Sequence, residues 1–356
     1  MTQATHGLGG LKYDPAKKER PPELNVFLAL VLIVVTFEVI GRLLLGDSFL
    51  FNTRDNVDTL FNMQRLSIII LQVSIVGIIA LGVTQVIITG GIDLSSGSIV
   101  GATAMIAMSF AQTTMVNGNP NPKAIFGDWA MDLPVLVPVL VGLGCGLIAG
   151  LVNGALVAYT RIPPFIATLG MMVTARGLAK WWSKGNPISF PTESYGTIGK
   201  GMTPVIIFVV LAVLFHCIMT YTRYGKHCYA IGSNEAAARM SGINVARHKA
   251  LVYAIAGMLA ALAAVVLSSK NLTAQAGMGV MYELDAIAMA VIGGISLSGG
   301  RGSILGTCLG ALIFGVIISG FTFLKLDAYY QEMVKGVIIV AAVVLDQWRQ
   351  KNRARG

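Results

Sequence analysis

The stretch Gly-Gly-Ile-Asp-Leu-Ser-Ser-Gly-Ser, residues 90–98, interrupts an apolar run that extends from Leu66 to Phe110. One membrane crossing takes about 20 apolar residues, so this run must hold two crossings. The glycine-rich interruption is therefore where the chain turns back. An aspartate is costly in lipid, so Asp93 is expected to face protein or water.

A similar stretch occurs near the other end of the chain. It reads Gly-Gly-Ile-Ser-Leu-Ser at 293–298, followed by Gly-Gly-Arg-Gly-Ser at 299–303. The match indicates an internal repeat, which is common among proteins that carry solutes across membranes. Ser296 stands where the first copy has Asp93, so the architecture does not require a carboxylate in both copies. A ten-span count makes the copies parallel, although many such proteins use inverted copies, and the sequence leaves this open.

The composition indicates a helical membrane protein. Hydrophobic residues make up 55% of the chain and charged residues 12%, about half the charged share of a typical soluble protein. The apolar runs are continuous, unlike the short alternating segments of a membrane β-barrel. We therefore predict an all-α integral membrane protein with about ten transmembrane helices, broken or re-entrant segments and an internal repeat. The expected spans are 26–45, 66–89, 95–113, 134–160, 163–183, 203–222, 249–269, 281–297, 303–323 and 330–347.

The distribution of basic residues predicts the orientation. The net charge is +9, and Lys and Arg gather in a tail at 1–25, a segment at 223–249 and a tail at 348–356. Basic segments of membrane proteins stay in the cytoplasm, and an even number of spans agrees with two cytoplasmic termini. The transmembrane domain is then 26–347. Because the charge lies between apolar runs, no nucleic-acid partner is expected.

A few polar residues inside the apolar runs are candidates for a solute path. Asp93 either lines that path, braces the interruption by accepting backbone N–H bonds, or caps a helix that begins at Leu94 or Ser95. Glu283 and Asp285 are two residues apart and diverge on a helix, so a helix-start or mouth-lining role is favoured over joint catalysis. The candidates are Asp93, Ser95, Ser96, Glu283, Asp285 and Ser296.

Other charged residues have simpler interpretations. Glu38 and Arg42 are four apart, so they are expected to pair on one helix face. Arg176 and Lys180, beside the tryptophans at 181–182, are expected to anchor a span end at the membrane interface. Stacking of a sugar on one of these tryptophans is the less favoured alternative.

The sequence offers no catalytic site. Gly199-Lys200 is followed by Gly201, and Ser194 takes the place of the first glycine of a P-loop, so no phosphate-binding loop is present. The sequence has no metal-ligand spacing and no paired nucleophile and base, so we expect neither an enzyme nor a cofactor or metal. If ATP drives this protein, a partner subunit must bind it.

The segment 223–249 contains the pattern of a short helix. It starts with Asn234 and Glu235, continues through three alanines and stops at Gly242. A short cytoplasmic helix is suited to dock into a partner, whereas the alternative is an inert loop. The candidate docking residues are Asn234, Glu235, Arg239, Ser241 and Gly242.

Three motifs in this order resemble a known family. They are Gly-Gly-Ile-Asp-Leu-Ser at 90–95, Arg-Tyr-Gly-Lys…Ser-Gly-Ile-Asn-Val at 223–245, and Tyr-Glu-Leu-Asp-Ala-Ile-Ala…Gly-Gly-Arg-Gly at 282–302. Together they are similar to bacterial ABC importer permeases for ribose, galactose, xylose and related sugars or polyols, including inositol, of the branched-chain-permease-like superfamily. The resemblance extends over about 66–347.

The resemblance implies a permease subunit that forms the path for a monosaccharide or cyclic polyol. It further implies a homodimer among the lipids of the bacterial inner membrane, a periplasmic sugar-binding protein, and a cytoplasmic ABC ATPase subunit that grips the helix near Asn234 as a coupling helix. One alternative is an ABC permease for branched-chain amino acids or another small solute. Another is an ion-coupled secondary transporter in which Asp93 or Glu283 is the coupling carboxylate.

Overall fold

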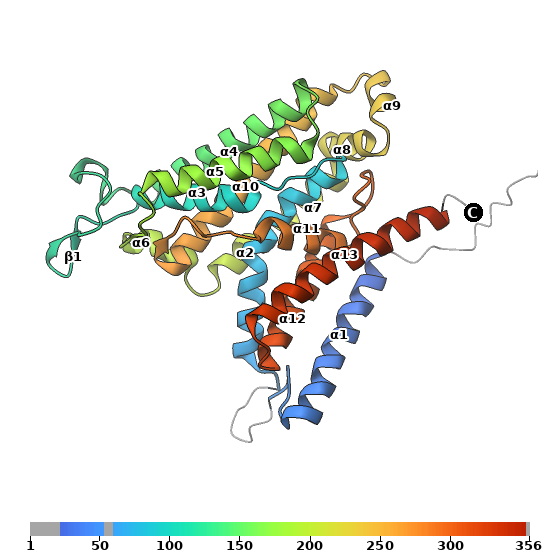
Figure 1. Cartoon of the computed structure of the whole chain (residues 1–356), viewed down its shortest axis with the longest axis horizontal. Helices are drawn as coiled ribbons and strands as arrows, with labels where there is room; N and C mark the ends of the chain where they lie inside the picture. The colour runs from blue at the N-terminus through green and yellow to red at the C-terminus, as the bar shows by residue number, and fades with distance from the viewer. Residues whose placement is uncertain (1–21, 53–59, 354–356) are drawn as a thin grey trace, which may run out of the picture.

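The computed structural model describes residues 22–52 and 60–353 and is almost entirely helical (Figure 1). The α-helices are α1 (Pro22–Leu45), α2 (Met63–Ile88), α3 (Ser96–Ser109), α4 (Leu136–Tyr159), α5 (Pro164–Trp182), α6 (Glu193–Gly196), α7 (Thr203–Tyr221), α8 (Arg223–Ser233), α9 (Glu235–Met240), α10 (Val245–Asn271), α11 (Tyr282–Ile292), α12 (Ile304–Phe323) and α13 (Ala328–Arg353). Two 3-10 helices are η1 (Asp128–Ala130) and η2 (Thr197–Gly199). Two antiparallel strand pairs join β1 (Met115–Val116) to β2 (Asn119–Pro120) and β3 (Ile188–Ser189) to β4 (Thr273–Ala274).

A helix occupies each of the ten predicted spans, which confirms the all-α membrane fold. Within the described residues, six helices are long and apolar enough to cross a membrane, namely α1, α2, α4, α7, α10 and α12. Helix α13 continues past the predicted span to Arg353. Most of the predicted N-terminal tail, residues 1–21, lies outside the described residues.

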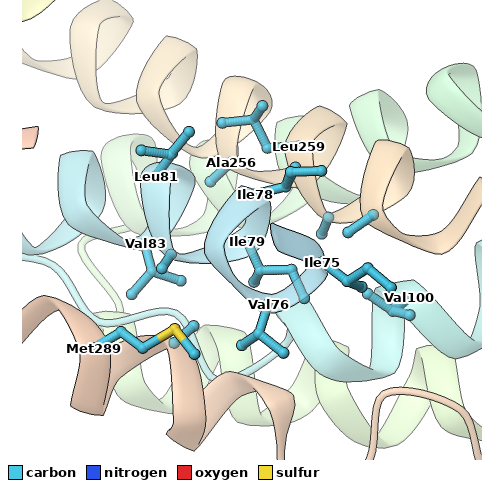
Figure 2. Close-up of a cluster of buried hydrophobic side chains, with 14 of the residues drawn as sticks. Ile75, Val76, Ile78, Ile79, Leu81, Val83, Val100, Ala256, Leu259 and Met289 are labelled. Atoms are coloured by element: carbon cyan, nitrogen blue, oxygen red, sulfur yellow. The ribbon is translucent and has the colours of Figure 1, made fainter. Parts of the chain in front are cut away.

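Helix α2 forms the centre of the molecule. Every residue from 73 to 88 is buried, as expected for a helix that is apolar on all sides. In Figure 2, Ile78 of α2 lies in one apolar cluster with Leu259 of α10, Val100 of α3 and Met289 of α11. Helix α1, in contrast, is largely exposed, as a lipid-facing helix would be. Its predicted pair is confirmed, because Arg42 Nε lies 2.8 Å from Glu38 Oε1.

Helices α4 and α10 approach closely through glycines. A Cβ at Gly146 would overlap the Gly257 carbonyl oxygen, and one at Gly150 would overlap that of Tyr253. Gly154 lies one turn further along, where an added Cβ would meet the backbone of Ala250. Small residues spaced four apart let membrane helices touch through their backbones, so this stripe fixes α4 against α10.

We expect Gly150→Ala to destabilise the protein, because the new methyl group meets backbone atoms that cannot rotate away. Overpacking of this kind costs about 1–3 kcal/mol. The measurement is the midpoint of thermal unfolding in detergent. The matched control is Gly144→Ala in the same helix, where a Cβ would meet nothing within 4 Å. Equal midpoints for the two variants would contradict the close packing of α4 on α10.

The glycine-rich stretches at 90–98 and 293–303 interrupt the helices, and we call them the first and second glycine breaks. A short helix lies beside each of them. Helix α3 has 14 residues and α11 has 11, which makes them about 21 and 16 Å long. The apolar core of a membrane is about 30 Å thick, so neither helix crosses it alone. The predicted span 281–297 is therefore wrong in length, because the backbone leaves the helix at Gly293 and takes a positive φ of 91° at Gly294. The predicted broken segments are confirmed.

Candidate functional site

The first glycine break turns around Asp93. The backbone N–H and the hydroxyl of Ser95 both donate to Asp93 Oδ1, at 2.8 and 2.6 Å. Asn153 of α4 in turn donates to Ser95 Oγ at 2.8 Å. Asp93 is buried with 1% of its surface exposed, so its carboxylate is held inside the protein and braces the turn.

The break is also clamped from two other helices. Thr168 of α5 and Tyr253 of α10 each direct a hydroxyl to the carbonyl oxygen of Ile92, at 3.3 and 3.4 Å. Helix α3 begins at Ser96, with Ser95 at the N-cap position and no side-chain cap. The predicted start at Leu94 or Ser95 is therefore early, and Asp93 bonds the N-cap residue instead of capping the first turn.

Asp93→Ala is expected to lower the midpoint of thermal unfolding, because it removes both bonds to Ser95. Each such bond contributes about 1 kcal/mol. Asp93→Asn should remain near wild type, because an amide oxygen accepts the same two bonds. If Asp93→Asn is as damaging as Asp93→Ala, the charge itself matters and the bracing role is insufficient.

Two polar atoms beside this break have no hydrogen-bond partner within residues 22–52 and 60–353. They are Ser96 Oγ and Asn153 Oδ1, and both residues are buried. A buried polar atom without a partner costs about 1–3 kcal/mol. Native proteins hold few such atoms, and a functional role is one reason to retain them.

The first turn of α11 brings Glu283 against α3. A Cβ at Gly97 would overlap Glu283 Oε2 and the carbonyl oxygen of Gly279, so only glycine fits there. Glu283 Oε2 is a third buried atom without a hydrogen-bond partner among the described residues. Arg176 of α5 lies near enough to interact electrostatically with Glu283.

Arg176 has a different role from the predicted one. Its guanidinium donates to the carbonyl oxygens of Ala276 at 2.5 Å, Met278 at 2.8 Å and Gly97 at 3.3 Å. It therefore ties the loop before α11 to α3 inside the protein, and the prediction of an interfacial anchor is wrong for this residue. A side chain with five donors is suited to hold several carbonyl groups at once. Lys180, one turn further along α5, is exposed as predicted.

The end of α5 lines an open groove of about 780 Å³. Trp181 is 71% exposed there, beside Lys180, Lys184 and Gln275. Trp182 instead packs inward, and its ring nitrogen donates to Ser109 Oγ at 2.8 Å. The two tryptophans therefore point into different surroundings.

Asp285 faces away from Glu283, as predicted from their spacing. Its Oδ2 lies 3.0 Å from Lys335 Nζ of α13, and both side chains are largely buried. Lys335 Nζ also lies 5.4 Å from the centre of the Phe314 ring. The pair joins the start of α11 to the last helix.

The second glycine break closes on itself and on the first break. Ser296 is buried, its N–H donates to the Arg301 carbonyl oxygen at 3.2 Å, and its own carbonyl accepts from Gly299 at 3.0 Å. Gly300 N–H donates to the carbonyl oxygen of Ile88, the last residue of α2, at 2.8 Å. The two breaks are thus in direct contact.

The predicted short helix is confirmed as α9. Asn234 Oδ1 accepts from the N–H of Ala237 at 3.0 Å and caps the first turn. Ser241 Oγ donates to the Ala237 carbonyl at 2.9 Å, and Gly242 ends the helix with a positive φ of 85°. All of α9 except Ala238 is exposed, and the helix projects at one end of the molecule (Figure 1).

Ion pairs fix the orientation of α9. Glu235 bonds Arg239 at 2.9 Å within the helix and Lys249 at 2.7 Å in α10. The bond from Lys249 lowers the pKa of the Glu235 carboxyl below its usual range, with a further contribution from Arg239. Glu235 is therefore ionised at neutral pH, and these bonds are lost only as the pH falls through the lowered pKa in acid.

Comparison with known proteins identifies the family. The family model for the permease component of the branched-chain amino acid transport system matches residues 65–343. The chain belongs to this permease family. It is therefore a multi-pass inner-membrane protein and a transport subunit rather than an enzyme.

Several import permeases are similar over most of this permease. The ribose import permease protein RbsC of Bacillus subtilis (strain 168) is 38% identical and aligns with 91% of the chain and 92% of its own length. RbsC of Escherichia coli (strain K12) is 39% identical, covering 82% of the chain and 88% of its own length. The galactose/methyl galactoside import permease protein MglC of Haemophilus influenzae is 38% identical, covering 83% of the chain and 90% of its own length. No solved structure matches the permease.

Two residues that shape this permease were not predicted from the sequence, and a third was given a different role. Asn153 braces the first break, Lys335 pairs with Asp285, and Arg176 ties α5 to α3. Asn153 and Lys335 are polar residues within predicted spans, and that position is itself a signal of a function or a partner.

Proposed function

We propose that this permease is the membrane subunit of an ATP-driven ABC importer for a monosaccharide or cyclic polyol, of the ribose, galactose, xylose or inositol class. The observation that carries the proposal is the similarity to ribose and galactose import permeases over most of both chains. These relatives favour a sugar over a branched-chain amino acid, although the family takes its name from the latter.

The geometry of α9 supports coupling to a separate ATPase. This helix is exposed, capped at its start and joined to α10 by the ion pair of Glu235 with Lys249, as a helix that transmits force to a partner needs to be. In our proposal α9 and both chain termini are cytoplasmic, and Glu235, Arg239 and the exposed Met240 contact the ATPase. Two copies of the permease form the path, and a periplasmic binding protein delivers the sugar.

The polar residues around the first break are suited to a sugar path. Hydroxyl, amide and carboxylate groups are the side chains that hydrogen-bond sugar hydroxyls, and Ser96, Asn153 and Glu283 each have a buried atom without a partner in the described residues. We propose that the path runs between the first break and α11. The proposed path residues are Asp93, Ser95, Ser96 and Glu283. Of the other candidates, Asp285 bonds Lys335 and Ser296 bonds within the second break, so we propose that these two support the path from beside it.

Uptake by cells tests the substrate class. A strain that lacks the gene and the same strain carrying it are given labelled ribose, galactose, xylose, myo-inositol or leucine. We expect the gene to restore uptake of one of the four sugars or polyols and not of leucine. Uptake of leucine alone would overturn the sugar proposal in favour of the branched-chain amino acid alternative, and uptake of none of the five would overturn it outright.

Met240→Lys tests the docking role of α9. Met240 is 84% exposed, and an apolar side chain in that position is suited to a partner pocket. Loss of a central interface contact typically costs about tenfold or more in affinity, so copurification of the ATPase and uptake should both fall. The matched control is Met202→Lys, because Met202 is also exposed but lies at the opposite end of α7 from α8. Equal copurification from the two variants would contradict docking at α9.

A further inference from the structure

Helix α8 connects α9 to the membrane-spanning helices through two tyrosines. Tyr224 Oη donates to Gln85 Oε1 of α2 at 2.7 Å, where Gln85 is fully buried. One and a half turns later, Tyr229 Oη donates to the Gly302 carbonyl oxygen of the second break at 2.9 Å. The two bonds join one short helix to α2, which leads into the first break, and to the second break itself.

The end of α8 meets both breaks through backbone atoms. A Cβ at Gly232 would overlap the carbonyl oxygen of Ile88 and would lie 2.5 Å from Gly300 N. Gly300 N–H donates to that same Ile88 oxygen at 2.8 Å. A Cβ at Gly299 would in turn lie 3.0 Å from the Gly232 carbonyl oxygen. Three chain segments thus touch here without side chains between them, and we call this place the glycine junction (Ile88, Gly232, Gly299 and Gly300).

The glycine junction is directly connected to α9. Ser233 and Asn234 alone separate Gly232 from the first residue of α9. A small apolar cluster of Ile231, Ala238 and Val245 holds α8, α9 and the start of α10 together. Displacement of α9 therefore moves the end of α8, because little flexible chain lies between them.

We infer that α8 transmits movement of α9 to both glycine breaks at once, with Tyr224 and Tyr229 as the residues that position it. This inference rests on the proposed coupling of α9 to an ATPase. The first break leads into α3 and the second leads into α12. A shift at the glycine junction therefore reorients α3, the short helix that packs against Glu283. Packed contacts without compliant side chains pass on small shifts with little loss.

The test is the number of sugar molecules imported per ATP hydrolysed. The permease is reconstituted in liposomes with the proposed ATPase and binding protein and with the sugar that the cells take up. We expect Tyr224→Phe/Tyr229→Phe to assemble normally and hydrolyse ATP, but to import about thirtyfold fewer sugars per ATP, as expected for the loss of two hydrogen bonds. Tyr221→Phe is the matched control, because Tyr221 ends α7 with 75% of its surface exposed.

The outcomes separate this inference from the proposed function. A wild-type ratio in the double variant overturns the role of α8 and leaves the proposed function intact. A lower yield of assembled complex that still imports the wild-type number of sugars per ATP also overturns it, because the tyrosines would then be structural only. If the double variant does not assemble, the single Tyr224→Phe and Tyr229→Phe variants decide by the same ratio. Absence of ATP-driven import by the wild type would instead overturn the proposed function itself.

Discussion

Gly232→Ala is expected to abolish sugar uptake while the protein still reaches the membrane. The added methyl group overlaps the Ile88 carbonyl oxygen and crowds Gly300 N, and both are backbone atoms held by their mutual hydrogen bond. Accommodation requires α8 to move away from the glycine junction. Forced overpacking costs about 1–3 kcal/mol, enough to shift a two-state coupling equilibrium by about 5- to 150-fold.

The control for this variant is Gly177→Ala. Gly177 lies in α5, where a Cβ would meet nothing within 4 Å, and alanine is the better helix former. Uptake per unit of membrane protein should remain at the wild-type level in the control. Normal uptake by Gly232→Ala would contradict the tight junction between α8 and the two breaks.

Lys335→Ala is expected to be among the most destabilising single changes. Asp285 is 6% exposed, and without Lys335 Nζ at 3.0 Å its carboxylate would be buried next to no cation within the described residues. Removing one partner of a buried ion pair costs about 3–5 kcal/mol. The measurement is the thermal unfolding midpoint, together with the yield of protein in the membrane.

A double variant provides the control for Lys335→Ala. Asp285→Asn/Lys335→Met removes both charges and retains the volume of the side chains, so it should recover most of the lost stability. If the double variant is as unstable as Lys335→Ala, the loss comes from packing around Lys335 and not from an unpaired carboxylate. A stable Lys335→Ala protein would show that the pair contributes little.

The features that depend on local patterns could be predicted from the sequence. The position of the helix in each of the ten predicted spans follows from continuous apolar runs, and the breaks follow from paired glycines that end α2 and α11. The limits of α9 were also predictable, because Asn234 caps a helix through its own short side chain and Gly242 tolerates a positive φ. Each of these depends on residues within a few positions of one another.

The remaining features depend on contacts between distant segments. Nothing near Gly232 in the sequence indicates that it meets Ile88 and Gly300, because helix packing brings these residues together. Arg176 looked like an interfacial anchor because two tryptophans follow it, yet the loop at 276–278 folds back to offer it carbonyl groups. The short length of α11 could not be predicted either. Apolar residues continue past Ile292, so the expected span runs on to 297 although the helix ends before the break.

The central claim is that ATP hydrolysed by a partner drives a sugar through this permease. The most direct measurement is accumulation of labelled sugar inside liposomes that contain the permease, its ATPase and its binding protein, with ATP on the side of α9. We expect accumulation against a gradient that needs ATP, persists when ionophores collapse the proton and sodium gradients, and is lost in Met240→Lys. Accumulation that continues without ATP and stops with the ionophores would contradict it.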